Sequence, residues 1–403
     1  MTQNRSWRIT ALVFFIIAGS APIDAHADAG FTKWINGFYA TAAKAGISEK
    51  TYRQAFAGVS EPDPDVLQKA GFQPEFKSQI WDYVDSRVNP YTVRIGREMA
   101  VKHRKTLDAI ERHFGVSRSI LLAIWSMESN YGAVLEKDDR LHNVPRALAT
   151  LAYADPKRAK YARTQLIAAL KILQSGNVSA KGLTGSWAGA MGHTQFIPTS
   201  YLLYAIDADG NGRKDIWNSI PDALATSANL LKQNGWQTGQ TWGFETAVPN
   251  GGNKYAGKTM TLGQWAKLGF ARPNGKGFSD PSARAELKMM AGGSGPGFLM
   301  IKNFFVIKRY NAADSYALAV GLLADEIAGY SGMAQTWPRP HGTLDIKEKF
   351  ELQSRMKELG YYNGEVDGNF GSGSKAAISA VQSRIGMAAD GQPSRSLLDA
   401  LRN

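Results

Sequence analysis

Residues 121–132 read Leu-Leu-Ala-Ile-Trp-Ser-Met-Glu-Ser-Asn-Tyr-Gly, an apolar helical run that ends in a lone carboxylate, Glu128. An apolar setting disfavours the ionised form of a carboxyl group and so raises its pKa. A general acid that works near neutral pH needs such a raised pKa. Glu128 is therefore a candidate acid, although a glutamate in the last turn of a helix is more often a solvated or capping group.

A second segment decides between these two interpretations. Residues 185–198 read Gly-Ser-Trp-Ala-Gly-Ala-Met-Gly-His-Thr-Gln-Phe-Ile-Pro. Together with Glu128, this segment resembles the B-type lytic murein transglycosylases, and the resemblance covers most of residues 31–330. It implies a lysozyme-like fold and cleavage of peptidoglycan between N-acetylmuramic acid and N-acetylglucosamine. By the same resemblance, Glu128 first protonates the glycosidic oxygen and then takes a proton from the sugar's 6-hydroxyl, which leaves a 1,6-anhydromuramoyl end.

The single carboxylate suits that chemistry. Most glycosidases pair two carboxylates, one as acid and one as nucleophile or base. The resemblance implies that the substrate's N-acetyl group assists and that its own hydroxyl replaces water, so one carboxylate is enough. The alternative within the fold is a lysozyme-like hydrolase, with Asp138 or Asp139 in the following loop as the second carboxylate.

The resemblance also assigns substrate-binding residues. Ser186 and Gln195 match polar positions that bind the sugar near the cleaved bond, and a fixed hydroxyl and amide would orient it. Tyr310 and Asn311 match a late active-site pair, in which Tyr310 is a candidate to hydrogen-bond or orient Glu128. Tyr131 is a further candidate for substrate binding.

Other residues of the two segments have two possible roles. Trp187 and Phe196, like Tyr131, offer faces on which sugar rings could stack, but buried packing is the usual role of such aromatics. Gly189 and Gly192 would allow close approach of a saccharide, or serve a tight loop that needs unusual dihedral angles.

Residues 207–218 read Asp-Ala-Asp-Gly-Asn-Gly-Arg-Lys-Asp-Ile-Trp-Asn and resemble an EF-hand loop. Glycine stands at position six, as the turn requires, while Asn218 replaces the bidentate glutamate of position twelve. We predict a structural calcium ion, with weaker binding or sodium as alternatives; a turn without an ion is the other interpretation. The candidate ligands are Asp207, Asp209, Asn211, the Arg213 carbonyl, Asp215 and, as a substitute for position twelve, Asp222.

The composition points to an exported protein. Residues 1–27 read as a secretory signal, with Arg5 and Arg8 before an apolar stretch and Ala25-His26-Ala27 as the cleavage site. The chain has no cysteine, which excludes disulfides, a thiol nucleophile and a lipid anchor on cysteine. The net charge of +12 favours an anionic partner, and export favours a cell-wall polymer over nucleic acid. We expect a periplasmic monomer that binds peptidoglycan, without a membrane span or an organic cofactor.

The pattern along the chain predicts an α+β, mainly helical protein. Residues 31–45, 119–127 and 161–173 have helical spacing, with Ser117 as a helix cap, Pro145 and Pro221 in first turns, and Gly176 and Gly235 after helix ends. Residues 236–297 mix short strands with turns. We predict a lysozyme-like catalytic domain over residues 28–333 and a linker over 334–343.

Residues 344–403 form the last predicted unit. Helical patterns at 346–359, 374–385 and 394–401 flank a turn-rich stretch, and the motifs resemble a three-helix peptidoglycan-binding domain. Such a domain would tether the enzyme to the wall and raise the local substrate concentration. Two other function classes stay open: a non-catalytic wall-binding scaffold, and a calcium-responsive regulator, against which the presence of a single loop argues.

Overall fold

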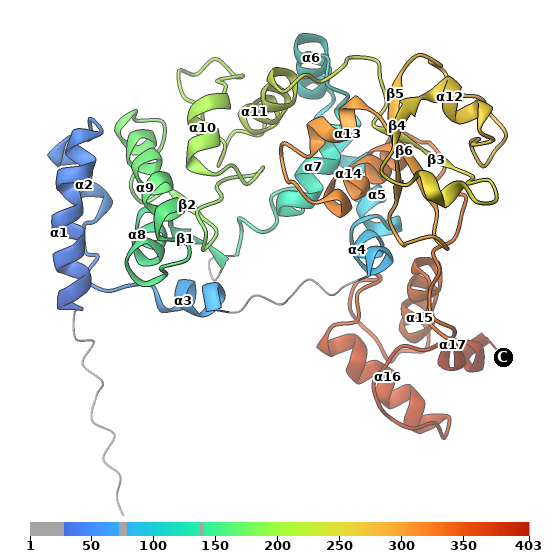
Figure 1. Cartoon of the computed structure of the whole chain (residues 1–403). Coiled ribbons are helices and arrows are strands. Elements are labelled where there is room, and N and C mark those ends of the chain that lie inside the picture. The colour runs from blue at the N-terminus through green and yellow to red at the C-terminus, as the bar shows by residue number, and fades with distance from the viewer. Residues whose placement is uncertain (1–27, 72–78, 138–139, 403) are drawn as a thin grey trace, which may run out of the picture.

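The computed structural model describes residues 28–71, 79–137 and 140–402 of the 403-residue chain, and helices dominate this part (Figure 1). The predicted signal segment lies outside the described residues. The helices before the small sheet are α1 (Ala29–Lys44), α2 (Glu49–Ala55), α3 (Pro64–Gly71), α4 (Ile80–Arg87), α5 (Pro90–Lys102), α6 (Arg104–Phe114), α7 (Arg118–Ser129), α8 (Val144–Ala154), α9 (Ala159–Gln174), α10 (Pro198–Tyr204) and α11 (Ile220–Gln233). The later helices are the 3-10 helix η2 (Gly252–Tyr255), α12 (Leu262–Lys267), α13 (Lys302–Ile307), α14 (Asp314–Ile327), α15 (Ile346–Glu358), α16 (Ser372–Arg384) and α17 (Arg395–Arg402).

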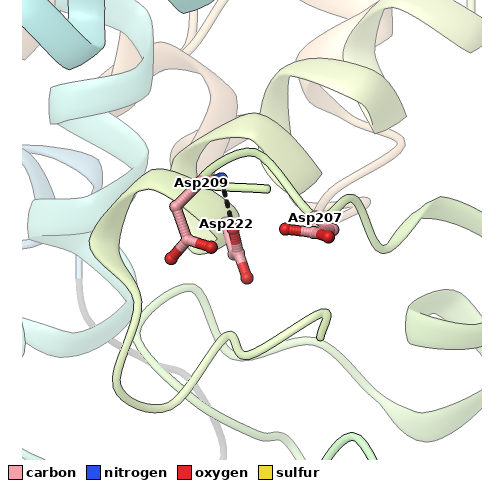
Figure 2. Close-up of side chains that lie close together, drawn as sticks. All are labelled: Asp207, Asp209 and Asp222. Atoms are coloured by element: carbon pink, nitrogen blue, oxygen red, sulfur yellow. Dashed lines mark hydrogen bonds between the residues drawn. The ribbon is translucent and has the colours of Figure 1, made fainter. Parts of the chain in front are cut away.

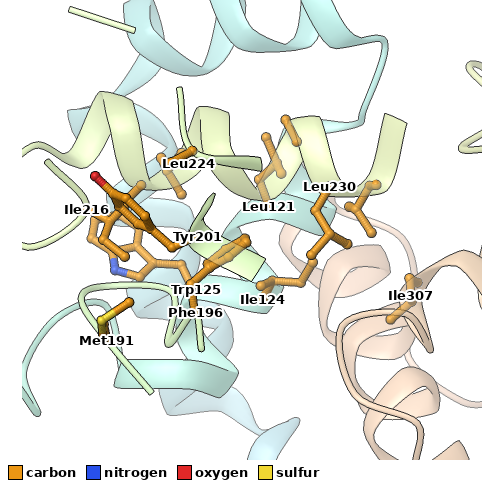
Figure 3. Packing of buried hydrophobic residues seen from close by; sticks show 14 of the residues in the cluster. Leu121, Ile124, Trp125, Met191, Phe196, Tyr201, Ile216, Leu224, Leu230 and Ile307 are labelled. Atoms are coloured by element: carbon orange, nitrogen blue, oxygen red, sulfur yellow. The ribbon is translucent and has the colours of Figure 1, made fainter. Parts of the chain in front are cut away.

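The central helix of the fold is α7, which carries Glu128. Its residues 119–126 are all buried, and the core around it draws on α11, on residues 191–217 and on α13 (Figure 3). Trp125 and Ile124 of α7 pack among Phe196, Tyr201 and Leu224 (Figure 3). A helix that is apolar on every side must be surrounded by other elements, so the end of α7 has a fixed position in the fold.

Two small antiparallel sheets accompany the helices. Strand β1 (His142–Asn143) pairs with β2 (Thr184–Gly185), and β2 leads into the segment 185–198. A four-stranded sheet with the order β3-β6-β5-β4 is built from β3 (Gly243–Thr246), β4 (Thr259–Thr261), β5 (Arg284–Met289) and β6 (Gly297–Met300). This sheet has its own apolar cluster around Trp265 and Phe270. The mainly helical fold with a small β part is as predicted.

The predicted helix boundaries agree with the structure within a few residues, and one cap differs. Gly176 and Gly235 follow the ends of α9 and α11, and prolines lie in the first turns of α8 and α11. Ser117 occupies the N-cap position of α7, but its side chain makes no capping bond. Its hydroxyl instead pairs with that of Ser119 at 2.8 Å, so the prediction of a Ser117 side-chain cap is wrong.

Residues 344–402, hereafter the C-terminal unit, have a separate core. Apolar side chains of α15, α16 and α17 meet around Leu352, Ile378 and Leu397, each fully buried. The buried Gln353 amide organises the turn between α15 and α16: its oxygen accepts from the backbone N–H of Asp367 at 3.0 Å and of Gly368 at 2.7 Å. The three-helix arrangement matches the prediction for this part of the chain.

The segment 334–343, predicted as a linker, has no regular structure but lies on the rest of the protein. The Glu245 carboxylate accepts hydrogen bonds from the backbone N–H groups of Ala334 at 2.8 Å and Gln335 at 2.7 Å. The Trp337 ring lies 6.1 Å from that of Phe298, centroid to centroid. The segment is therefore held against strands β3 and β6 of the small sheet. Within the described residues, we find no helix of the length and apolarity that crossing a membrane requires.

Candidate active site

Glu128 lies in the last turn of α7, at the edge of the apolar core. Burial raises its pKa from 4.5 to about 7, while a hydrogen bond from Tyr316 and the positive charge of Arg87 act in the opposite direction. A carboxyl group with this pKa is partly protonated near neutral pH, as a group that both donates and accepts a proton must be. The raised pKa that the apolar run predicted is thus present, and its main cause is loss of solvent.

The hydrogen-bond donor to Glu128 is Tyr316, which the sequence did not single out. Its hydroxyl donates to Glu128 Oε1 at 2.5 Å from the first turn of α14, and the side chain is 4% exposed. The other oxygen, Oε2, accepts no hydrogen bond within the described part of the chain. One oxygen is therefore held by the protein, and the other is free to meet a substrate.

Two side chains of α4 interact electrostatically with Glu128. Arg87 lowers the pKa of Glu128 through its charge, and the negative charge of Glu128 adds to burial in raising the pKa of Tyr83. The Arg87 guanidinium lies 5.9 Å from the centre of the Tyr83 ring. No local motif marks these residues, because they precede Glu128 by about forty positions in an ordinary amphipathic stretch.

The end of α7 is bonded to the segment 185–198. The Ser129 hydroxyl donates to the His193 carbonyl at 2.6 Å, and the Trp125 indole N–H donates to His193 Nδ1 at 3.3 Å. These bonds bring the two motifs of the sequence together, although nearly seventy residues separate them. The segment itself is a compact loop in which Met191 bridges both Gly185 and Phe196.

Ser186 and Gln195 both lie in that loop. The Ser186 hydroxyl oxygen accepts from the Ala190 backbone N–H at 3.1 Å, and the Gln195 amide donates to the Gly192 carbonyl at 2.9 Å. Both side chains are only partly buried. Their local bonds fix their positions before a substrate arrives, which lowers the entropic cost of orienting it.

Backbone strain is concentrated in the same two segments. Among the described residues, the non-glycine residues with positive φ are Asn130, Tyr131 and Gln195, at 49°, 56° and 50°. Such conformations cost about 1–3 kcal/mol each and occur preferentially at functional sites. Two of the three, Tyr131 and Gln195, are substrate-binding residues in our sequence prediction.

The glycines of the loop are explained by the protein itself. Gly189 and Gly192 have φ of 86° and 67°. A Cβ atom would lie 2.9 Å from the Leu148 side chain at Gly189, and 2.4 Å from the Ile216 carbonyl oxygen at Gly192. Of the two interpretations, the structure therefore supports the tight loop, because protein atoms fill the space beside both glycines.

Tyr310 and Asn311 do not contact Glu128 by hydrogen bonds. The Tyr310 hydroxyl donates to the Thr194 carbonyl at 2.7 Å and lies 3.1 Å from the Ser227 hydroxyl. Asn311 is exposed, and its side chain accepts from the Ala313 backbone N–H at 3.0 Å. The hypothesis that Tyr310 hydrogen-bonds Glu128 is wrong. Tyr310 supports the loop beside the acid. The bond to Glu128 comes from Tyr316, in the first turn of α14.

The aromatic candidates differ in exposure. Phe196 is 3% exposed and packs edge-on against Tyr310, so it belongs to the core. Tyr131 packs edge-on against Trp125 at 5.4 Å and is partly buried. Trp187 is also partly buried, with the Arg158 guanidinium 5.5 Å from its ring centre. Asp138 and Asp139, the second carboxylates of the hydrolase alternative, lie outside the described residues.

The loop 207–218 forms a cluster of carboxylates with the start of α11. Oxygen atoms of Asp207, Asp209 and Asp222 lie within 4.8 Å of one another (Figure 2). Asp222 is fully buried, accepting from the N–H of Ala208 and of Asp215, each at 2.8 Å. Three converging carboxylates repel one another without a cation, and their oxygens are the ligands that calcium prefers. The donor set thus fits calcium.

The remaining candidate ligands are held within the loop. The side chains of Asn211 and Asp215 accept hydrogen bonds from backbone N–H groups two residues ahead, at 2.9 Å and 3.0 Å. Asn218 donates its amide to the Asp215 carboxylate at 3.0 Å. Arg213 is exposed, and only its carbonyl was a candidate. Asp222, the predicted substitute for position twelve, is the one of these residues whose carboxylate lies beside those of Asp207 and Asp209.

Comparison with known proteins decides the family. A family model described as a transglycosylase SLT domain matches residues 30–325, and one described as a putative peptidoglycan binding domain matches residues 350–401. The chain belongs to the transglycosylase SLT family. The resemblance to B-type lytic transglycosylases that the two motifs carried is confirmed, together with the C-terminal match.

This transglycosylase SLT chain is similar to three proteins of known name. The membrane-bound lytic murein transglycosylase B of Escherichia coli is 31% identical over 248 residues, which are 60% of this chain and 65%, slightly under two thirds, of that protein. The crystal structure of SltB3 from Pseudomonas aeruginosa in complex with NAG-anhNAM-pentapeptide is 42% identical with a TM-score of 0.74, covering 93% of this chain and all of that chain.

The third similar protein is the Escherichia coli lytic transglycosylase Slt35, whose structure in complex with calcium is 26% identical with a TM-score of 0.61. It covers 74% of this chain and 93% of that chain. These matches support the lysozyme-like, mainly helical fold class that the sequence predicted for this transglycosylase SLT member.

Proposed function

We propose that this protein is a lytic transglycosylase that cleaves the β-1,4 bond between N-acetylmuramic acid and N-acetylglucosamine in peptidoglycan. The observation that carries the proposal is Glu128, a carboxyl whose pKa burial raises to about 7 and whose Oε1 is held by Tyr316. Family membership supports it, as does the similar SltB3 structure, which holds a NAG-anhNAM-pentapeptide.

The proposed reaction balances without water. Protonated Glu128 gives its proton to the glycosidic oxygen as the bond to C1 of the muramoyl sugar breaks, which releases a 4-hydroxyl on the N-acetylglucosamine. The acetamido oxygen of the muramoyl sugar stabilises C1 from the opposite face. The sugar's 6-hydroxyl then attacks C1 and gives its proton to the Glu128 carboxylate, which restores the acid and closes the 1,6-anhydro ring.

The surrounding residues have positioning roles in this scheme. The Tyr316 hydroxyl donates to the carboxylate form and limits how far burial raises the pKa. Ser186 and Gln195, fixed by their own loop, are proposed to hold the acetamido group, with Tyr131 and Asn311 as further substrate contacts. Tyr310 acts indirectly, through the Thr194 carbonyl that it holds.

We propose calcium as a structural ion, and no organic cofactor. Asp207, Asp209 and Asp222 would hold it, with the Arg213 carbonyl, Asn211 and Asp215 as the other candidate ligands of the loop. A bound cation would neutralise these carboxylates and fix the start of α11. The similar Slt35 structure contains calcium, which supports the assignment.

We further propose that the mature protein is a periplasmic monomer, exported by residues 1–27 and free of a lipid anchor. Residues 28–333 would form the catalytic domain, and the C-terminal unit would bind peptidoglycan, in keeping with its family match. The net charge of +12 suits an acidic polymer.

The deciding experiment is mass spectrometry of the soluble fragments that the purified protein releases from peptidoglycan sacculi. Fragments with 1,6-anhydromuramic acid from the wild type, and none from Glu128→Gln, support the proposal. Glu136→Gln, a change at an exposed glutamate eight residues later, is the matched control and should cleave normally. Reducing ends that contain added water would identify a hydrolase, and sacculi that are bound but uncut would identify a scaffold.

A further inference from the structure

A buried carboxylate on α4 joins the helical part of the protein to the C-terminal unit. Asp85 is 4% exposed and accepts from Arg339 Nη2 at 2.8 Å and from Lys349 Nζ at 3.3 Å. Arg339 belongs to the segment 334–343, and Lys349 to α15. Breaking a buried ion pair from one side is costly, because the remaining charge is left uncompensated. The position of α4 thus depends on residues more than 250 positions later.

On the other side of the same helix, the partly buried Tyr83 and the exposed Arg87 interact electrostatically with the acid. Tyr83 and Arg87 are four positions apart and share a face of α4, while Asp85, midway between them, is turned by about 180°. Arg87 lowers the pKa of Glu128 through its charge, and Glu128 contributes to the raised pKa of Tyr83. One short helix therefore contacts the C-terminal part on one side and the surroundings of Glu128 on the other.

The position of α4 is set by its neighbours. It has eight residues, and an isolated helix of fewer than about 12 residues is marginal in water. Val84 and the following Val88 are buried in the main core, and α4 packs against α14, which carries Tyr316. Figure 1 shows α4 next to α5 and α14, with α15 close by on the side of the C-terminal unit.

We propose that Asp85 is a positioning residue for the reaction: its ion pairs with Arg339 and Lys349 hold α4 so that Arg87 and Tyr83 face Glu128. The C-terminal unit then supports catalysis through α4, in addition to any binding to the wall. This inference rests on the proposed function of Glu128.

The charges around Glu128 determine the expected signature. The titratable and charged groups that act on it are Tyr316 of α14, Tyr83 and Arg87 of α4, and Tyr310 after α13. Arg87 is the positive charge among them. Displacement of α4 moves the Arg87 charge away from Glu128, so the pKa of Glu128 should rise. The alkaline limb of the pH–rate profile should then move to higher pH.

Another ion pair at the same interface offers a matched control. Glu365 of the C-terminal unit lies 3.6 Å from Arg94 of α5, and both side chains are more than half exposed. Exposed pairs of this kind contribute about 0–1 kcal/mol. Glu365→Gln changes a carboxylate between the same two parts without touching α4, and should leave the rate and the pH profile unchanged.

The experiment compares full-length wild type, Asp85→Asn, Arg339→Gln and the double variant on soluble peptidoglycan oligosaccharides, for which wall tethering is irrelevant. We expect each single change to lower kcat roughly tenfold, with KM nearly unchanged, and to move the alkaline limb upward by about one pH unit. The double variant should have the same kcat as Asp85→Asn, because that single change already breaks the contact with Arg339. Arg339→Gln retains the native Asp85–Lys349 pair and tests the proposal if Asp85→Asn fails to fold.

Two results would overturn the proposal. One is a variant that melts earlier or binds sacculi less well while its kcat and pH profile on the soluble substrate match those of the wild type. The other is an unchanged pKa of Glu128, measured by NMR of ¹³C-labelled glutamate with Glu128→Gln for assignment. The titration needs no activity, so it still decides the inference if the wild type releases no anhydro product and the proposed function fails.

Discussion

Glu128, which is partly buried, and Asp222, which is fully buried, are two carboxyls whose pKa is raised mainly by burial. Glu128 accepts one hydrogen bond, from the Tyr316 hydroxyl, and keeps Oε2 free. Asp222 accepts from three backbone N–H groups, of Ala208, Asp209 and Asp215, and uses both oxygens. The donors and the remaining exposure thus separate a carboxyl that can exchange a proton with a substrate from one that holds a loop.

The largest expected effect is the loss of cleavage in Glu128→Gln. The amide keeps the shape of the side chain but can neither give nor take the proton, so we expect the rate to fall by about 10³-fold or more. Quantifying anhydro ends released from sacculi measures this effect. A rate within tenfold of the wild type would show that another group is the acid.

The corresponding change at the other carboxyl should affect stability instead. Asp222→Asn replaces an oxygen that accepts from the backbone by an amide that cannot, and removes one carboxylate of the calcium cluster. We expect a loss on the order of 2–3 kcal/mol in unfolding free energy. Chelation with EGTA should lower the melting temperature of the wild type and change that of the variant little. Equal sensitivity to EGTA in both proteins would contradict the assigned ligand.

The difference in stability between Glu128→Gln and the wild type should depend on pH. The pKa of Glu128 is about 7 in the folded protein and near 4.5 in the unfolded chain, so the folded state binds more protons between these values. Stability therefore falls as pH rises from 4.5 to 7, and the penalty is complete above 7. At pH 8 we expect the variant to be more stable than the wild type by on the order of 2 kcal/mol, and equal to it at pH 4. Denaturant melts at both values provide the test.

The smallest expected effect comes from Tyr316→Phe. Loss of the hydroxyl removes a bond that favours ionised Glu128, so the pKa of Glu128 should rise and the alkaline limb of kcat/KM should move upward. A hydrogen bond to a charged group is worth about 1.5–3 kcal/mol, and we expect a rate loss of roughly tenfold or somewhat more. The matched Tyr330→Phe, at a 71% exposed tyrosine, should behave as the wild type. An unshifted pH profile in Tyr316→Phe would show that the bond does not tune the acid.

The amino-acid sequence by itself determined the elements and the motifs. Helical spacing located α7 and the three helices of the C-terminal unit, and the loop 207–218 was evident from its ligand spacing. Glu128 could be named because an acid at the end of an apolar helix is a local pattern. These features depend on residues within about a dozen positions of one another, and local spacing is what a single sequence displays.

Only the tertiary structure decided which side chains meet Glu128. Tyr316 follows it by 188 residues and Arg87 precedes it by 41, and neither position differs in pattern from an ordinary helix face. The sequence indicated Tyr310 and did not single out Tyr316, whereas the packing of α14 on α7 brings Tyr316 to Glu128. Asp85 likewise finds Arg339 and Lys349 only because the C-terminal unit docks beside α4. Contacts between distant residues follow from how the buried faces of helices and sheets pack together. The local periodicity of a sequence does not indicate which two faces will pack against each other.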